Sequence, residues 1–267
     1  MDKKIILRRM NALKDYNRFN SKDYIDRIFP NFIELHGDRL YGDDLTVIGG
    51  IASVDQQPVT VIGQLRGKTL EENIKYNFSM CHPEGFRKSL RLMKQADKFG
   101  RPIVCFVDTL GAYPGVEAEE RGQSSAIANN LMEMHRLKVP IISVIIGNGG
   151  SGGALAFLVA NEIAMLENSL FSVISPKACA NILWKDTSRQ LDAAQMLKIT
   201  AEEIKKLNII DTIISEPVLD MMVDYEKVSE NVKEYIIKTL KKYRYKTKTQ
   251  LIKERCYKYR NIGRYLS

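Results

Sequence analysis

A unit that occurs twice in the middle of the chain constrains the fold more than any other feature. Pro102 introduces the apolar run IVCFVDT, which is followed by the loop LGAYPGVEAEERG and a helical pattern. Pro140 introduces IISVIIG, which is followed by NGGSGG and a second helical pattern. Short apolar strands separated by helices are typical of a parallel sheet covered on both faces. Right-handed crossovers then bring both glycine loops to the carboxyl edge of the sheet, so we predict an α/β fold.

The flanking sequence completes one domain. Residues 46–67 predict two strands around a turn at 55–58, and Pro83 opens a helix that ends at Gly100. We divide the chain into an N-terminal helical segment (1–35), the α/β domain (36–217) and a C-terminal helical, basic tail (218–267).

The composition is that of an ordinary soluble protein, which we expect to be cytoplasmic. Of 267 residues, 45% are hydrophobic and 27% are charged, and no apolar run approaches the roughly 20 residues that span a bilayer. The first residues, MDKKIILRRM, hold too short an apolar segment for a secretory signal. The cysteines lie far apart, so we expect buried free thiols and no metal site at Cys81, Cys105, Cys179 and Cys256.

Much of the net charge of +8 lies in the C-terminal sequence KKYRYKTKTQLIKERCYKYRNIGRY. Basic residues interleaved with tyrosines occur in nucleic-acid-binding proteins, so nucleic-acid binding is one interpretation of this segment. A solvated helical surface, or a surface that docks an acidic partner, is the interpretation we favour.

The loop at residues 147–153 is the sharpest local signal, with five glycines in seven residues. Bare N–H groups at the positive end of a helix bind oxyanions or phosphates. Gly147, Gly149 and Gly152, with Glu167 20 residues after Gly147, fit a dinucleotide-binding fingerprint. The mid-chain position and the earlier glycine loop argue against that interpretation.

Two other chemistries fit the same loop. Gly149 to Gly153 also matches the G-x-S-x-G pattern of serine hydrolases. All three histidines precede Ser151, which excludes the usual α/β-hydrolase order and leaves only a Ser–Lys dyad with Lys177. The third interpretation is an oxyanion hole made of backbone amides, which needs no side-chain base.

The earlier loop, residues 108–115, carries a second signal. Gly111, Ala112 and Gly115 with Tyr113 form a glycine-rich loop after a parallel strand, which predicts a shaped wall with free amides. An ordinary connection, with Asp108 as a helix cap or structural anchor, is the alternative.

Several long motifs, in the same order, resemble the carboxyltransferase α subunit of bacterial acetyl-CoA carboxylase. They are DTLGAYPGVEAEERGQSSAIANNL, IGNGGSGGALA and FSVISPKACANILWKD. The resemblance extends from about Tyr24 to Pro217. It includes His36-Gly37-Asp38-Arg39 with Asp43-Asp44, the tract 77–85, and Ile209-Ile210-Asp211, and the tract from Arg255 to Tyr265 is similar as well. This resemblance displaces the dinucleotide interpretation.

The resemblance implies a crotonase-like ββα superhelix with flanking helices, in an α2β2 assembly that makes malonyl-CoA for fatty acid biosynthesis. Carboxybiotin would arrive on a biotin carboxyl carrier protein that an ATP-dependent biotin carboxylase has charged. A β subunit would hold acetyl-CoA and carry any zinc, and this chain would be active only with that subunit.

The resemblance also assigns roles to the two loops. It makes Gly152 and Gly153 the catalytic residues, whose N–H groups stabilise negative charge on the ureido oxygen of biotin. The residues expected to bind the biotin side of the cleft are Gly149, Gly150, Gly111, Ala112 and Gly115.

The chain departs from the family's usual pattern at several positions. Asn148 stands in place of Glu, Lys177-Ala178 in place of Glu-Gly, and Cys81 in place of Pro, and the Gly-Gly-Ala-His tract expected after Pro217 is absent. The alternatives are therefore a specialised paralogue that carboxylates another acyl-CoA, or another crotonase-type enzyme that acts on CoA thioesters.

Overall fold

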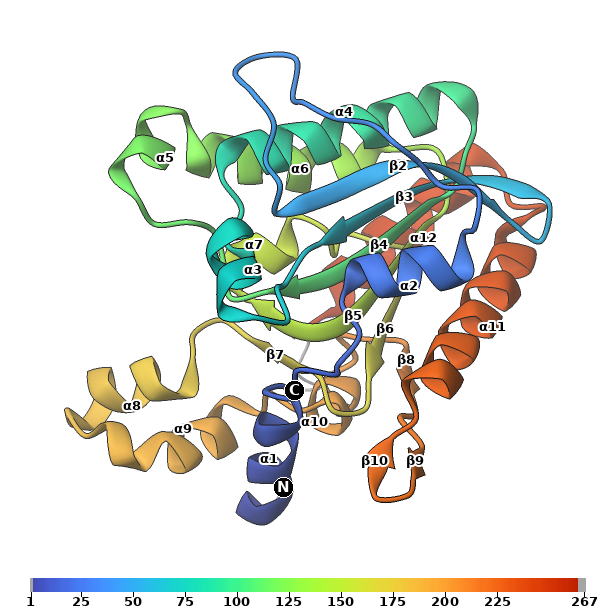
Figure 1. Cartoon of the computed structure of the whole chain (residues 1–267). Helices are drawn as coiled ribbons and strands as arrows, with labels where there is room; N and C mark the ends of the chain where they lie inside the picture. Colours follow the sequence, from blue (N-terminus) through green and yellow to red (C-terminus); the bar gives the residue numbers. More distant parts are fainter. Residues whose placement is uncertain (1, 264–267) are drawn as a thin grey trace.

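The computed structural model describes residues 2–263, which form an eight-stranded sheet covered by helices (Figure 1). The strand order is β1-β2-β3-β4-β5-β6-β8, and the short strand β7 pairs with the end of β5. The strands are β1 Ile33–Glu34, β2 Val47–Val54, β3 Gln57–Gln64, β4 Ile103–Thr109, β5 Ile141–Gly150, β6 Glu162–Leu166, β7 Leu170–Ser172 and β8 Thr212–Ile214.

The sheet is parallel from β3 through β8, as the two repeated units predict. The hairpin predicted in residues 46–67 is also confirmed, because β2 and β3 pair antiparallel. Its turn is shorter than expected: Asp55 and Gln56 alone turn the chain, with φ of 48° and 61°. Two consecutive positive φ values are those of the two-residue turn that matches the twist of paired strands.

Alternating side chains along the strands form two hydrophobic cores. Ile62, Cys105 and Ile145 face α4 (Pro83–Phe99) and α6 (Gln123–Arg136). Val61, Phe106 and Val144 face α2 (Ser21–Ile28) and α11 (Tyr225–Tyr243). Figure 1 shows α4 and α6 on one side of the sheet and α2 and α11 on the other. This is the covered sheet that the continuous apolar strands predict.

The N-terminal segment is only partly helical, so the prediction of helix throughout residues 1–35 is wrong. Helix α1 is Lys3–Ala12, and α2 begins after Asn20, whose side chain accepts hydrogen bonds from the N–H groups of Lys22 and Asp23. Helix α2 ends at Ile28 because Pro30 disfavours helical backbone in the residue before it. Residues 33–34 then pair with β2 as β1.

The connection between α1 and α2 lies across the carboxyl end of β5. Arg18 is buried, and its Nε and Nη2 donate to the carbonyl of Ile146 at 3.0 and 2.7 Å. Its Nη1 also pairs with Glu216 at 2.7 Å. The N-terminal segment therefore braces the strand that leads into the glycine-rich turn.

The C-terminal helices pack on the body of the protein instead of forming a solvated tail. Helix α11 buries Val228, Val232, Ile236 and Leu240 against the sheet. Several basic side chains of this region pair with carboxylates: Lys241 with Asp55, Lys242 with Glu162, Lys246 with Glu254 and Lys258 with Asp211. The end of the predicted tail, residues 264–267, lies outside the described residues.

Arg255, on α12 (Lys248–Asn261), is fully buried. It donates to the carbonyls of Leu137 and Val139 at 2.9 and 3.0 Å and to Oδ1 of Asn161 at 2.8 Å. These contacts join α12 to the segment between α6 and β5. Burial lowers the pKa of this guanidinium to about 10, so it stays charged at neutral pH.

Helices α8 (Pro176–Trp184) and α9 (Gln190–Leu197) project from the body below the sheet edge in Figure 1. Helix α1 packs against α9 through Ile6, Leu13 and Ala194. Helix α10 is Ala201–Lys206, and a hairpin of β9 (Val218–Leu219) and β10 (Met222–Val223) precedes α11. No helix within residues 2–263 is long and apolar enough to cross a membrane.

Replacing Arg255 by Met should lower the free energy of unfolding by about 3 kcal/mol, because buried carbonyls lose their charged donor. Lys253→Met on the same helix is the control, since Lys253 is exposed, and it should change stability by less than about 0.5 kcal/mol. Urea unfolding of both variants measures the difference. Equal stability of the two would show that Arg255 does not anchor α12.

Candidate active site

The two glycine loops meet at the carboxyl edge of the sheet, as the repeated units predict. A Cβ on Gly153 would lie 2.5 Å from the carbonyl carbon of Gly111 and 2.7 Å from the nitrogen of Ala112. A Cβ on Gly150 would collide with the carbonyl of Leu110. Only glycine permits this approach, so these glycines are required by packing as well as by any chemistry.

The glycine-rich turn, residues 149–153, runs from the end of β5 into α7 (Ser151–Leu155). Ser151 is exposed and has φ of 51°, which reverses the chain direction at the start of the helix. The first N–H groups of any α-helix lack an acceptor within it. Among the described residues, we find no hydrogen bond donated by the N–H of Gly152 or Gly153. Gly152 is half-buried, whereas Gly153 is buried.

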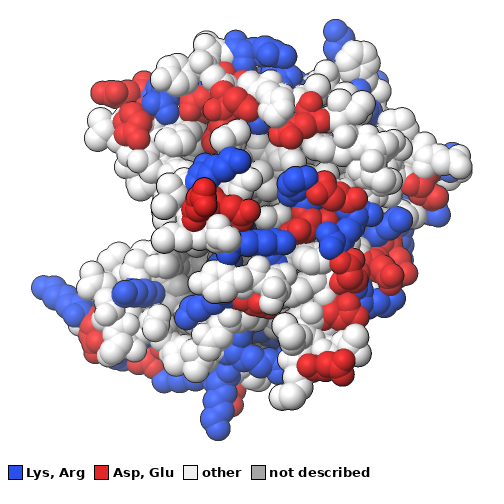
Figure 2. Space-filling model, viewed as in Figure 1, with Lys and Arg blue, Asp and Glu red and all other residues white. Residues whose placement is uncertain are grey.

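Two cavities flank this turn. One lies between the turn and the start of α8, and Gly149, Gly150 and Ser151 line it with residues 172–176. The other is largely apolar, and Ser151 and Gly152 line it with Leu155, Phe171, Val173, Leu197, Ile204, Leu207 and Ile209. Figure 2 shows a hollow between the part of the molecule that carries α5 (Val116–Glu120) and the part that carries α8 and α9. No Lys, Arg, His, Asp or Glu among the described residues lines either cavity.

Gly111 and Ala112 lie against the glycine-rich turn, while Gly115 lies apart from it. Gly111 has φ of 146°, a conformation that favours glycine, and Ala112 forms an isolated bridge with Cys81. Gly115 caps α5, and a Cβ there would meet Tyr113 and Glu117. Its predicted place on the biotin side of the cleft stays a prediction.

Gln64 is a supporting residue that the sequence did not single out. It is the last residue of β3 and is fully buried, and its Nε2 donates to the carbonyl of Gly153 at 3.1 Å. The only sequence signal is a polar residue at the end of an apolar strand, which does not reveal its partner.

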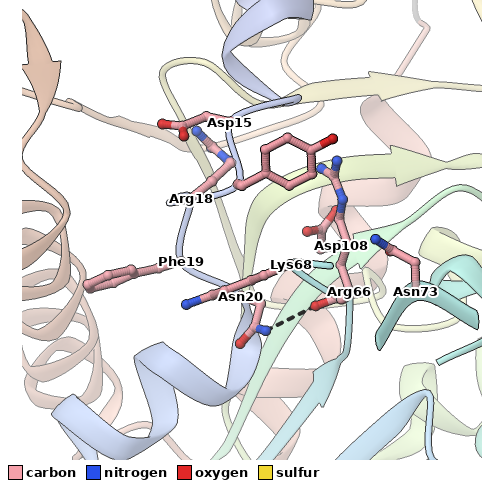
Figure 3. Close-up of a pocket in the computed structure, with 10 residues that line it drawn as sticks. Asp15, Arg18, Phe19, Asn20, Arg66, Lys68, Asn73 and Asp108 are labelled. Atoms are coloured by element: carbon pink, nitrogen blue, oxygen red, sulfur yellow. Dashed lines mark hydrogen bonds between the residues drawn. The ribbon is translucent and has the colours of Figure 1, made fainter. Parts of the chain in front are cut away.

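Asp108 contacts the backbone of β5 just before the glycine-rich turn. Its Oδ1 accepts from the N–H of Asn148 at 2.8 Å, and its carboxyl group occupies the space that a Cβ on Gly147 would fill. Figure 3 shows Asp108 beside Arg66 in a small polar pocket, which Asn73 also lines. Burial raises the pKa of Asp108, although the positive charge of Arg66 and the Asn148 N–H oppose this. The structural-anchor interpretation of Asp108 is confirmed.

The acidic residues of the His36-Gly37-Asp38-Arg39 tract and of Asp43-Asp44 also have structural contacts. Asp38 accepts from three backbone N–H groups of its own loop, and Asp43 pairs with the buried Lys88 at 2.7 Å. Asp44 accepts from the N–H of His82 at 2.8 Å, directly before α4. These carboxylates fix the loop before β2 against α4.

The dinucleotide motif in the glycine-rich turn is not supported by its geometry. Gly147 and Gly149 lie within β5, α7 has only five residues, and Glu167 pairs with Arg9 at 3.0 Å. A dinucleotide site would instead need a glycine loop that opens a longer helix and a free acidic residue. The histidines make their contacts elsewhere: His36 with Asp43, His82 with Asn77 and Arg121, and His135 with Tyr259.

The departures from the family pattern lie at or near this site. Asn148 lines the cavity beside α8, and Lys177 is exposed at the start of that helix. Cys81 is buried, and its carbonyl accepts from the N–H of Tyr113 at 3.0 Å. All four cysteines are free, as predicted, although Cys256 is only half-buried.

Comparison with known proteins gives a consistent result. The family described as acetyl co-enzyme A carboxylase carboxyltransferase-like matches residues 6–263. A protein of Clostridium perfringens (strain ATCC 13124), named acetyl-coenzyme A carboxylase carboxyl transferase subunit alpha, is 54% identical over 254 residues, which are 95% of this chain and 94% of that protein. A protein of Natranaerobius thermophilus named as subunits beta/alpha is 52% identical, and this chain covers 43% of it.

Solved structures extend the comparison to the fold. A transcarboxylase 12S crystal structure has a TM-score of 0.70 and 18% identity, covering 86% of this chain and 42% of that chain. A Pseudomonas malonate decarboxylase heterodimer has a TM-score of 0.64 and 18% identity, covering 82% of this chain and 89% of that chain. These neighbours share the crotonase-like fold, so the predicted fold class is confirmed.

The raised pKa of Asp108 predicts a pH-dependent stability. Its contribution is fully present below the unfolded pKa, about 4, and is lost as the pH rises through the folded value. The wild type should therefore lose stability relative to Asp108→Asn as the pH rises above about 4, as urea unfolding at each pH will measure. Asp26→Asn, which removes a half-exposed carboxylate, is the control. If the difference in unfolding free energy between the wild type and Asp108→Asn does not change with pH, the prediction is refuted.

Proposed function

This chain belongs to the acetyl-CoA carboxylase carboxyltransferase α family, and on that premise we propose that the N–H groups of Gly152 and Gly153 stabilise the charge that develops during carboxyl transfer. The protein is an α-type subunit that acts in the carboxylation of acetyl-CoA to malonyl-CoA. One observation carries the proposal: among the described residues, the N–H groups of Gly152 and Gly153 have no acceptor, and they lie at the start of a helix beside a cavity that Gly152 lines, where β4 and β5 end.

The residues present fit a biotin group. When bound, carboxybiotin would supply the carboxyl group as CO2, and the N–H groups of Gly152 and Gly153 would then stabilise the negative charge left on its ureido oxygen. Gly152 and Gly153 offer two adjacent backbone amides in the first turn of α7, where helix N–H groups lack an acceptor within the helix. In other enzymes, one preorganised donor of this kind contributes about 3 kcal/mol to the transition state.

The cavities beside the turn suit this role. Because no Lys, Arg, His, Asp or Glu among the described residues lines them, charge at the turn is met by backbone dipoles and by uncharged polar side chains such as Asn148 and Ser172. Apolar walls such as Leu155, Phe171 and Ile204 lower the polarity around the turn, which strengthens each amide interaction. Gly149 and Gly150, which line the first cavity, and Gly111 and Ala112, which pack on the turn, form the rest of the biotin side.

We propose the partners from the same family membership. A β subunit would complete the cleft and hold acetyl-CoA, in keeping with the subunit name of the relatives and with the relative named beta/alpha. A biotin carboxyl carrier protein would deliver the cofactor, and a biotin carboxylase would recharge it with ATP. The assembly would be an α2β2 heterotetramer, with zinc carried only by the β subunit.

Gly153→Ala tests the proposal, because its Cβ would collide with Gly111 and Ala112 and displace the amides. With a coexpressed β partner and carboxybiotin, we expect kcat for malonyl-CoA formation to fall about 100-fold. Gly152→Ala is the matched comparison, since a Cβ there meets only Ile127 at 3.8 Å. It should lower kcat by less than Gly153→Ala does.

Copurification with the β partner shows that the variants still assemble. The wild-type chain alone should form no malonyl-CoA. Unchanged turnover by assembled Gly153→Ala would contradict the role of the amides, and acyl-CoA turnover by the isolated chain would favour a different crotonase-type enzyme.

A further inference from the structure

Thr109, the last residue of β4, connects two segments beside the active site. It is fully buried, and its Oγ1 accepts from the N–H of Gly111 at 3.0 Å. The same hydroxyl lies 2.8 Å from the carbonyl oxygen of Gly111 and donates to the carbonyl of Ser79. A hydroxyl has one proton and two acceptor lone pairs, so a single side chain can join both segments.

The pairing of β4 with β5 is irregular just before Thr109. Between the pairs Val107–Ile145 and Thr109–Gly149, β4 has one residue, Asp108, whereas β5 has three, Ile146 to Asn148, so the bulge lies in β5. Bulges of this kind re-aim side chains and are common next to active sites. Here Asp108 reaches the N–H of Asn148, and Thr109 reaches Ser79 and Gly111.

The segment that contains Ser79 is strained. Asn77, Phe78 and Ser79 have φ of 47°, 52° and 58°, although none is glycine. Left-handed helical backbone costs about 1–2 kcal/mol per residue for such side chains. The turn is held by its own bonds, including Met80 N–H to the Asn77 carbonyl at 3.0 Å, and by the hydroxyl of Thr109.

The hydroxyl of Thr109 also contacts Gly111, in the loop that packs against the glycine-rich turn. Gly111 has φ of 146°, and a Cβ there would meet no atom within 4 Å, so no side-chain packing of its own holds this residue. The heavy atoms nearest to a Cβ built on Gly153 also belong to Gly111 and Ala112. A shift of this loop would therefore move one wall of the amide site directly.

We propose that Thr109 is a positioning residue for carboxyl transfer: its hydroxyl uses the strained turn at residues 77–79 as a support and holds Gly111 and Ala112 in place against Gly153. This inference rests on the proposed function of Gly152 and Gly153. Thr109 lines the cavity between the glycine-rich turn and α8, and in this proposal it acts through the backbone that surrounds the amides.

The test compares Thr109→Val, which keeps the shape but lacks the hydroxyl, with Thr109→Ser, which keeps the hydroxyl. In the assembled enzyme, kcat of Thr109→Val should fall about 10- to 100-fold, since a displacement of about 1 Å can cost this much. KM for acetyl-CoA should change less than about twofold, because the β subunit holds that substrate. Thr109→Ser should restore kcat to within about threefold of the wild type.

A second readout does not depend on turnover. Amide hydrogen exchange in the peptide that contains Gly111 should be about 10-fold faster in Thr109→Val than in the wild type or Thr109→Ser, because the N–H loses its acceptor. Thermal unfolding and copurification with the β partner show which variants are folded. If Thr109→Val does not fold, Thr109→Cys replaces it, and its weakly bonding thiol should give an intermediate loss of kcat.

The outcomes separate the two proposals. Wild-type kcat in folded Thr109→Val, or an equal loss in Thr109→Ser, would overturn the positioning role and leave the proposed function intact. A wild-type assembly that forms no malonyl-CoA would overturn the proposed function. In that case, amide hydrogen exchange at Gly111 decides the positioning role separately. Unchanged exchange in Thr109→Val would overturn that role, whereas faster exchange would support the hydrogen bond from the Gly111 N–H to the Thr109 hydroxyl.

Discussion

The backbones of β4 and β5 approach each other so closely where they end that side chains have no room between them. A Cβ on Gly150 would meet Leu110, and one on Gly153 would meet Gly111 and Ala112. The chain turns at Ser151, whose φ is 51°, and α7 starts with N–H groups for which we find no acceptor among the described residues. The amide site is therefore a consequence of how two parallel strands end.

Three buried polar side chains hold this arrangement through the backbone. Arg18 donates to the carbonyl of Ile146, Asp108 accepts from the N–H of Asn148, and Gln64 donates to the carbonyl of Gly153. They come from the N-terminal segment, β4 and β3, so distant parts of the chain all support one short turn. The chemistry needs fixed dipoles, and these contacts keep those dipoles from reorienting.

Much of the fold could be predicted from the sequence, because continuous apolar strands and glycine loops follow local rules. The parallel sheet and the meeting of the two loops needed only those rules. The N-terminal helix was predicted too long because Pro30 was not counted as a stop. Thr109, Gln64 and Arg255 could not be assigned, because their partners are backbone groups distant in sequence, brought close by a bulge or by helix packing.

A crystal structure of this chain with its β partner and a biotin analogue would test the central claim most directly. The account predicts the ureido oxygen about 2.7–3.1 Å from the nitrogens of Gly152 and Gly153, with Gly111 and Ala112 still packed on Gly153. A ureido oxygen bound elsewhere, or amides that donate to the protein itself when the cofactor is present, would contradict it.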